Sequence, residues 1–137
     1  MLELIQTHHF AANNARHPAK PDSIRRIEIS LSYMLQNLDK PIHISTLGKL
    51  AGVSTSYFSY LFKCATGDSP NHFLIRVRMR RGCELLRETD LSVKEVAGLL
   101  GYLDPLYFSR VFKLVIGIPP TKYRVMTSGS DNIERHR

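Results

Sequence analysis

The stretch YFSRVFK at residues 107–113 is a near copy of YFSYLFK at residues 57–63, which lies 50 positions earlier in the chain. The match continues at the same offset through three further pairs: Gly67 with Gly117, Pro70 with Pro120, and Phe73 with Tyr123. Upstream, the match persists with an offset of 49, so the second copy holds one extra residue in its turn. Because solenoid folds need at least ~3 copies to bury a continuous core, two copies predict one duplicated supersecondary unit.

The first copy has the features of two helices joined by a tight turn. A helix is expected after Ser45, and Gly52 can adopt the left-handed backbone that the turn requires. Ser54 can then cap a second helix over residues 55–65. Residues 45–66 therefore predict a helix-turn-helix motif, in which the second helix is the one that enters a DNA major groove.

The second copy repeats these features over residues 92–115. Ser92 takes the position of the first cap, and Gly101 lies in the turn. Asp104 caps the second helix ahead of Pro105, whose missing amide is harmless at the first helical position. The matching order of caps and turns predicts a second helix-turn-helix motif.

The segments before and between the copies are assigned from composition and periodicity. Residues 1–22 are polar, contain two prolines and show no sustained period, so they are interpreted as a linker or the tail of an upstream region. From Ser23 apolar residues recur at helical spacing, which predicts a helix that ends before Pro41. A linker helix is expected between the two motifs, at about residues 70–87.

After the second motif, a short last helix is expected at about residues 119–126, followed by a flexible tail over residues 127–137. No segment shows the two-residue alternation of a convincing strand. Residues 23–126 therefore predict one all-α domain with about seven helices.

Helical spacing also sorts the faces of the two second helices. Eight apolar residues are expected to face the core: Phe58, Leu61, Phe62 and Ala65 in the first copy, and Phe108, Val111, Phe112 and Val115 in the second. The residues left outward are Ser56, Ser59, Tyr60 and Lys63, and in the second copy Leu106, Ser109, Arg110 and Lys113. The repeated phenylalanines are interpreted as core residues that pack each motif. The outward positions that differ between the copies are interpreted as places where two DNA segments could be read differently.

Composition restricts the class of partner. The chain carries 19 basic and 12 acidic residues, a net charge of +7, which favours a polyanionic partner such as nucleic acid. No apolar run approaches the ~18 residues of a membrane span, and the opening MLELIQTHHF does not resemble a signal peptide, so a cytoplasmic chain is expected. Cys64 and Cys83 lie in predicted helices and are interpreted as buried free thiols.

Residues 101–124, GYLDPLYFSRVFKLVIGIPPTKYR, carry a family signature, G-[FY]-x-[DS]-x-x-[YF]-F-S-R-x-F-K-x-x-x-G-x-x-P-x-x-[YF]-R. On this basis residues 44–124 resemble the DNA-binding domain of the AraC/XylS family of bacterial transcription regulators. The resemblance implies an all-helical domain with two recognition helices, which enter successive major-groove segments on one face of the DNA. A rigid linker helix separates them.

In this context the outward residues are assigned to DNA. Base contacts are expected from Ser56, Ser59, Tyr60, Pro105, Leu106, Ser109 and Arg110. Phosphate contacts are expected from Ser54, Lys63, Lys113 and Lys122. Arg110 can meet guanine O6 and N7 together, whereas Tyr60, which replaces the arginine usual in the first recognition helix, cannot. The second motif is therefore expected to dominate sequence discrimination. Packing of Tyr60 on a neighbouring helix and ordinary solvated lysines are the alternatives.

Two glycines depart from the family pattern. Gly48 and Gly82 stand where the family prefers alanine inside helices. Each costs ~1 kcal/mol relative to alanine unless a close helix contact needs it, so a less stable first half is expected.

The resemblance also implies partners. It implies a transcription activator that contacts RNA polymerase. No cofactor is expected. No metal site is predicted either, because His8 and His9 lack further ligands at matching spacing. Two recognition helices in one chain predict binding of double-stranded DNA as a monomer, with a dimer possible through a missing upstream domain. Residues 1–22 are too short for the effector domain that the family usually carries, which favours a carboxy-terminal fragment over a stand-alone short member.

The sequence bears on two other classes of protein, an enzyme and a binding module without sequence preference. The same unit occurs fused to DNA-repair methyl-transfer proteins, but the sequence has no P-C-x-R or C-x-x-C cluster and no P-loop, H-E-x-x-H or G-x-S-x-G motif, so no enzymatic activity is predicted. A sequence-blind DNA-binding protein or a helical protein-interaction module remains the alternative, in which the basic charge carries no sequence preference.

Overall fold

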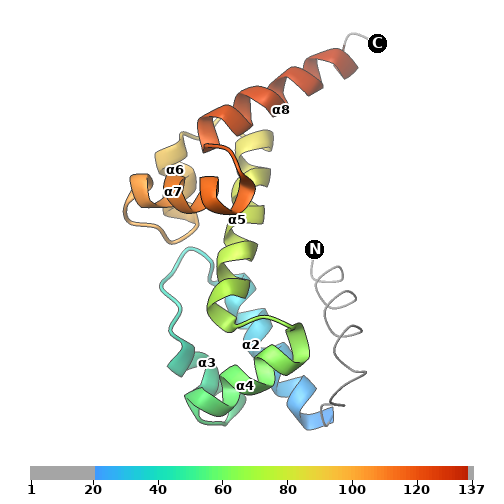
Figure 1. Ribbon diagram of the computed structural model, residues 1–137, viewed down its shortest axis with the longest axis vertical. Coiled ribbons are helices and arrows are strands. Elements are labelled where there is room, and N and C mark those ends of the chain that lie inside the picture. Colours follow the sequence, from blue (N-terminus) through green and yellow to red (C-terminus); the bar gives the residue numbers. More distant parts are fainter. Residues whose placement is uncertain (1–20, 136–137) are drawn as a thin grey trace. The chain divides into compact units, whose positions relative to one another are not determined.

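The computed structural model describes residues 21–135 of the chain. Over this range it consists of seven helices, labelled α2 to α8, and no strand, which confirms the all-α prediction (Figure 1). Residues 1–20, most of the predicted linker or tail, and residues 136–137 lie outside the described part. The helices fall into two compact units, and each unit contains one of the two predicted helix-turn-helix motifs.

Unit 1 contains α2 (Pro21–Gln36), α3 (Ile44–Ala51), α4 (Thr55–Thr66) and the start of α5 (Pro70–Glu88), up to Leu74. Helices α2, α3 and α4 contact one another around an apolar core. The buried apolar residues of this unit are Ile27, Leu31, Met34, Leu47, Ala51, Phe58, Leu61, Phe62, Ala65, Phe73 and Leu74. All four residues of α4 that were predicted to face the core are therefore buried.

Local capping explains the helix boundaries in unit 1. Gly52 ends α3 with a φ of 73°, in the left-handed region that glycine enters at little cost. The Ser54 hydroxyl accepts a hydrogen bond from the Tyr57 amide at 3.2 Å and caps α4, as predicted. Helix α3 begins at Ile44, slightly earlier than predicted, because the His43 carbonyl accepts the first backbone hydrogen bonds and no side-chain cap is used.

Unit 2 contains the rest of α5 from Ile75, together with α6 (Val93–Leu99), α7 (Pro105–Ile116) and α8 (Pro120–Arg135). The buried core of this unit consists of Met79, Leu85, Leu86, Val96, Ala97, Leu100, Phe108 and Phe112. Helices α6 and α7 contact each other, and α7 also contacts α8. The second motif thus lies between α5 and α8 in the chain.

The predicted caps of unit 2 are confirmed. The Ser92 hydroxyl accepts a hydrogen bond from the Glu95 amide at 3.1 Å at the start of α6. The Asp104 carboxylate accepts one from the Leu106 amide at 2.9 Å at the start of α7. Pro105 occupies the first position of α7, where its missing amide leaves no hydrogen bond unmade.

The repeated aromatic residues pack in nearly the same way in both units. In each unit one phenylalanine of the recognition helix lies between a second phenylalanine of that helix and an aromatic residue of the next helix. The ring centroids are separated by 5.7 Å for Phe62–Phe58 and 5.3 Å for Phe62–Phe73, and by 5.8 Å for Phe112–Phe108 and 5.7 Å for Phe112–Tyr123. The contact with the next helix is edge-on in both, at 78° and 75°. The sequence repeat is therefore a repeat of packing.

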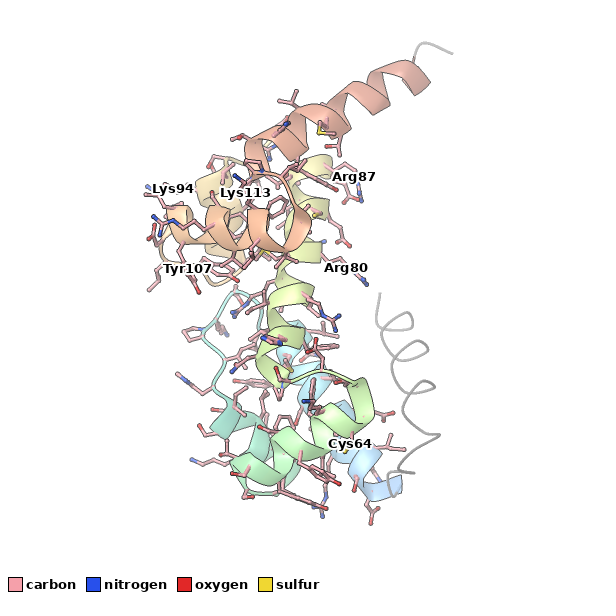
Figure 2. All side chains as sticks on the ribbon, viewed as in Figure 1. Cys64, Arg80, Arg87, Lys94, Tyr107 and Lys113 are labelled. Atoms are coloured by element: carbon pink, nitrogen blue, oxygen red, sulfur yellow. The ribbon has the colours of Figure 1, made fainter. Side chains whose placement is uncertain are left out.

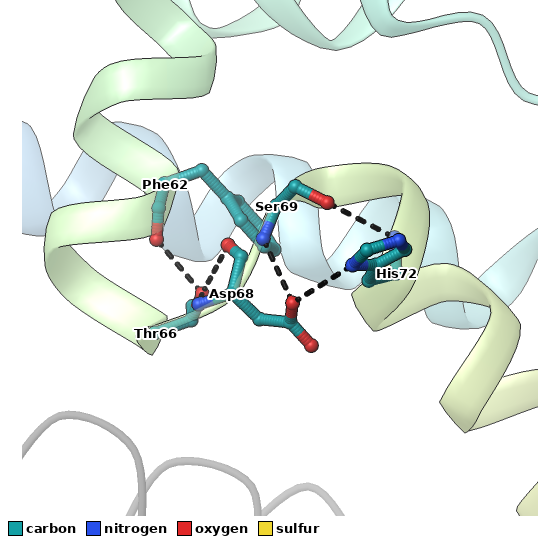
Figure 3. Close-up of polar contacts among 5 residues, drawn as sticks. All are labelled: Phe62, Thr66, Asp68, Ser69 and His72. Carbon is teal, nitrogen blue, oxygen red and sulfur yellow. Dashed lines mark hydrogen bonds and ion pairs between the residues drawn. The ribbon is translucent and has the colours of Figure 1, made fainter.

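Polar contacts determine the turn between α4 and α5 (Figure 3). The Thr66 hydroxyl donates to the Phe62 carbonyl oxygen at 2.8 Å at the end of α4. The Asp68 carboxylate accepts from the Ser69 amide at 3.0 Å and lies 3.5 Å from Nδ1 of His72. The Ser69 hydroxyl accepts from the His72 amide at 3.3 Å, which caps the first turn of α5. The linker helix therefore starts at a defined point after the first recognition helix.

The segment Leu38–Pro41, which connects α2 to α3, belongs to unit 2. The Arg78 guanidinium on α5 donates from Nη2 to the Lys40 carbonyl oxygen at 2.8 Å. At Gly101, whose φ is 82°, an added Cβ would lie 2.9 Å from the Leu38 carbonyl oxygen. The turn of the second motif therefore needs glycine both for its backbone conformation and for the close approach of this segment.

Gly48 and Gly82 both lie at close contacts. A Cβ at Gly48 would lie 3.2 Å from the carbonyl oxygen of Val53, and a Cβ at Gly82 would lie 3.1 Å from Cδ1 of Leu100. Both distances are shorter than ordinary van der Waals contact. Gly48 thus allows α3 to approach the following turn, and Gly82 allows α5 to approach the end of α6. These close contacts offset the cost of a glycine inside a helix.

Helix α8 is longer than the predicted last helix. It extends over Pro120–Arg135, whereas a helix had been expected only at about 119–126, with a flexible tail over 127–137. The residues that follow Met126, TSGSD, have low helix propensity, which is why the sequence predicts an earlier end. The Thr127 hydroxyl donates to the Tyr123 carbonyl oxygen at 3.0 Å, so this polar side chain is satisfied within the helix.

Candidate nucleic-acid interface

Helix α4 exposes the face that was predicted to point outward. Ser56, Tyr60 and Lys63 are exposed, and Ser59 is half-buried. Ser54, one residue before the helix, is exposed as well, and a hydroxyl that accepts a cap hydrogen bond can still donate its proton to a phosphate. Because Phe58 and Phe62 are fully buried, the helix cannot rotate without losing its core contacts.

Helix α7 exposes the corresponding face of unit 2. Leu106, with 71% of its surface accessible, Arg110 and Lys113 are exposed, while Pro105 and Ser109 are half-buried. A guanidinium, an ammonium and an apolar side chain therefore share one solvent-facing surface. This set can form hydrogen bonds to base edges, contact phosphates and touch a thymine methyl group.

One residue predicted to face the core of unit 2 does not. Val115, near the end of α7, is 40% exposed, whereas its counterpart Ala65 in α4 is buried. Helical spacing gives the direction of a side chain but not how far along the helix the core extends, so the prediction for Val115 was wrong.

Each recognition helix also exposes a tyrosine that sequence analysis left unassigned. Tyr57 is 49% exposed and Tyr107 is 56% exposed. The Tyr57 ring stacks with that of Tyr60, with centroids 6.3 Å apart and planes at 21°. The Tyr107 ring instead lies 6.0 Å from Tyr102 in the turn of the second motif. The sequence repeat could have indicated a role for this tyrosine, because both copies have it although its position on the helix does not face the core.

Tyr60 presents an uncharged side chain. A hydrogen bond with the Cys64 thiol is the main cause that raises the pKa of Tyr60 above its ordinary value. The phenol is therefore neutral at physiological pH. At the position where α7 presents the cation Arg110, α4 presents a neutral aromatic ring.

Two arginines of the linker helix pair with acids on their own helix. Arg81 donates to the Glu84 carboxylate at 2.8 Å, and Arg87 lies 3.5 Å from the Glu88 carboxylate. These pairs are exposed, so they contribute little to stability. They do reduce the positive charge that this face of α5 could offer to a phosphate.

Figure 2 shows labelled side chains of unit 2 on two sides of the unit. Arg80 and Arg87 project from α5 on the side opposite to that from which Lys94 and Tyr107 project. Lys94 is exposed on α6, the first helix of the motif, which in helix-turn-helix proteins crosses the DNA backbone. Sequence analysis did not single out Lys94, because one surface lysine has no distinguishing pattern.

Two basic residues of α8 have different environments. Lys122 is exposed near the start of the helix, as a phosphate contact requires. Arg124, the last residue of the family signature, donates from Nε to the Leu86 carbonyl oxygen at 3.0 Å and from Nη2 to that of Thr89 at 3.4 Å. Arg124 therefore ties α8 to the end of α5.

Both cysteines are free thiols and are half-buried, whereas buried thiols had been predicted. Burial is the main cause that raises the pKa of Cys83, which keeps this thiol protonated and weakly nucleophilic. Across residues 21–135 no three His, Cys, Asp or Glu side chains gather closely enough to hold a metal ion, and His8 and His9 lie outside this range. None of the helices described for this chain is long and apolar enough to cross a bilayer.

Two motifs in one chain, each with a buried aromatic core and an exposed second helix, define the class of tandem helix-turn-helix domains. Comparison with known proteins agrees. A family described as a helix-turn-helix domain matches residues 47–126. The chain belongs to the AraC/XylS family of helix-turn-helix transcription regulators, as the sequence signature predicted.

Named relatives of this chain are transcription regulators. The MmsAB operon regulatory protein of Pseudomonas aeruginosa is 32% identical over 93 residues, which are 68% of this chain and 30% of that protein. The transcriptional activator Btr of Bacillus subtilis is 34% identical over 90 residues, 66% of this chain and 17% of that protein. The chain thus spans less than a third of the length of these two relatives.

Solved structures show the same fold. The DNA-binding domain of AdpA, determined in complex with a target DNA, has a TM-score of 0.73 and 30% identity, covering 77% of this chain and 94% of that one. The C-terminal domain of the response regulator YesN from Fusobacterium nucleatum has a TM-score of 0.70 and 28% identity, covering 73% of this chain and 98% of that one. The similarity therefore covers nearly the whole of both solved domains.

Proposed function

We propose that this chain binds double-stranded DNA at promoters and regulates transcription, with α4 and α7 as its recognition helices. The observation that carries the proposal is the duplicated aromatic packing, which holds each recognition helix while its polar and basic residues stay exposed. A net charge of +7 adds a general attraction to the phosphate backbone. The similarity to the AdpA domain, solved with its target DNA, supports the proposal.

The proposed contacts are divided between base edges and phosphates. The base-contacting set is Ser56, Ser59, Tyr60, Pro105, Leu106, Ser109 and Arg110, and the phosphate-contacting set is Ser54, Lys63, Lys113 and Lys122. Lys94 joins the second set because of its exposed position on α6. Within the first set, Arg110 has the greatest capacity for discrimination, because its guanidinium can form two parallel hydrogen bonds to one guanine.

The proposed mode of action follows from two recognition helices in one chain. One copy can occupy two groove segments, so this chain binds as a monomer, and the two unlike helices read two unlike elements. Activation through RNA polymerase is proposed from the family and from relatives named as activators, such as Btr. A protein that acts on bacterial promoters does so in the cytoplasm, where the chromosome lies, and this role requires no catalysis.

A salt series distinguishes this function from its alternatives. We expect a duplex selected from a random pool to be bound about 10³-fold or more tightly than a scrambled duplex of the same composition. Both affinities should fall as salt rises, because phosphate contacts release counterions. Equal affinity for the two duplexes, with the same salt slope, would identify a sequence-blind DNA-binding protein. Absence of salt-dependent DNA binding would favour a protein-interaction module.

A further inference from the structure

The exposed face of α4 carries two aromatic rings side by side. Tyr57 and Tyr60, the third and sixth residues of the helix, are 49% and 58% exposed. Their rings are nearly parallel, with planes at 21° and centroids 6.3 Å apart. Two large rings that support each other in solvent form a preorganised surface, because neither ring has to be ordered when a partner binds.

This pair is specific to the first recognition helix. In unit 2 the matching tyrosine, Tyr107, lies 6.0 Å from the ring of Tyr102, which itself packs 5.4 Å from Phe108. Unit 1 has Val53 in place of Tyr102, so the turn offers no ring, and it has Tyr60 where unit 2 has an arginine. In unit 1 the ring beside Tyr57 is therefore that of Tyr60 on the same helix, whereas in unit 2 the ring beside Tyr107 is that of Tyr102 in the turn.

The ring of Tyr60 offers a partner more surface than its single hydroxyl does. The Cys64 thiol is the main cause that raises the pKa of Tyr60, so the hydroxyl stays neutral and can give a partner at most one hydrogen bond. Toward solvent, Tyr57 and Tyr60 together present an uncharged, flat and largely apolar surface. Such a surface is suited to an apolar group on the partner and poorly suited to guanine, whose major-groove edge presents only acceptors.

We infer that the stacked pair Tyr57–Tyr60 contacts the 5-methyl groups of thymines in the DNA element bound by α4. This inference rests on the proposed function and specifies which bases the DNA element bound by α4 contains. The thymine methyl is the apolar group that the major-groove edges of unmodified DNA present, and residues in the N-terminal half of a recognition helix are those that meet base edges. The first element is therefore rich in thymine, and the second element contains the guanine that Arg110 contacts.

The test removes the methyl group and nothing else. In the duplex selected from a random pool, each thymine of the first element is replaced by deoxyuridine, and binding of the full chain is measured at fixed salt. We expect binding to weaken about fourfold for each contacted methyl group, the effect of one buried carbon group. Tyr57→Ala and Tyr60→Ala should lose this preference for thymine over uracil. Both residues are exposed, so the variants should fold, which their helical circular dichroism would verify.

Matched variants separate the ring from the hydroxyl and one element from the other. Tyr60→Phe keeps the ring and should keep the thymine preference, and Arg110→Ala should bind more weakly overall but keep it in the first element. Equal binding of the thymine and deoxyuridine duplexes, a first element without thymine, or loss of the preference in Tyr60→Phe would overturn this inference alone. A pool that returns no preferred sequence would overturn the proposed function together with it.

Discussion

Replacement of Phe112 by alanine is expected to lower the free energy of unfolding by ~3 to 5 kcal/mol, enough to unfold unit 2 of a marginally stable domain. Phe112 is fully buried, and its ring lies 5.8 Å from Phe108 and 5.7 Å from Tyr123. Alanine would leave a cavity between α7 and α8 at the point where the recognition helix is held. Urea or thermal unfolding followed by circular dichroism measures the effect.

The matched control lies on the same helix. Leu114 is 85% exposed, so Leu114→Ala should change the free energy of unfolding by no more than about 0.5 kcal/mol. Phe62→Ala should act on unit 1 as Phe112→Ala acts on unit 2, because Phe62 makes the same two aromatic contacts. If Phe112→Ala were as stable as Leu114→Ala, the repeated phenylalanines would not be what holds the recognition helices.

Arg110→Ala is expected to have the largest effect on sequence preference. Loss of the guanidinium should cost ~1 to 3 kcal/mol of binding free energy on the preferred site and flatten the preference at one base pair. Lys113→Ala is the matched comparison on the same exposed face of α7. If Lys113 contacts only phosphate, this variant should weaken binding to all sequences alike and reduce the salt slope by about one.

Tyr60→Ala should fall between these two variants, because a phenol gives apolar contact and at most one hydrogen bond. The measurement is the Kd of the three variants against a panel of single-base changes at fixed salt. Should Tyr60→Ala produce the greater loss of specificity while Arg110→Ala weakens every duplex equally, the division of labour between the two motifs would be the reverse of the one proposed.

The parts of the fold that the sequence predicted are those that local chemistry and repetition determine. Ser54, Ser92 and Asp104 cap helices because a side-chain oxygen precedes an apolar period in each case. Phe62 and Phe112 were expected inside because helical spacing and the repeat agree on their direction. At these two phenylalanines the structure confirmed the prediction, whereas at Val115, where spacing and the repeat also agree, it did not.

The features that sequence analysis missed depend on contacts between distant residues. The role of Arg78 follows from the position of Lys40, which is 38 residues away, and that of Arg124 from the carbonyls at the end of α5. The stacking of Tyr57 on Tyr60 depends on rotamers that spacing does not specify. Helix α8 continues past Met126 through residues of low helix propensity, so propensity alone predicted its end too early.

We propose that one chain reads two unlike DNA elements with two unlike recognition helices. Selection of bound duplexes from a random pool, followed by sequencing and by measurement of the number of chains per duplex, tests it most directly. We predict an asymmetric pair of short elements with centres about 34 Å apart, roughly one turn of DNA, bound by a single chain. A palindromic site that requires two chains for binding would contradict this account.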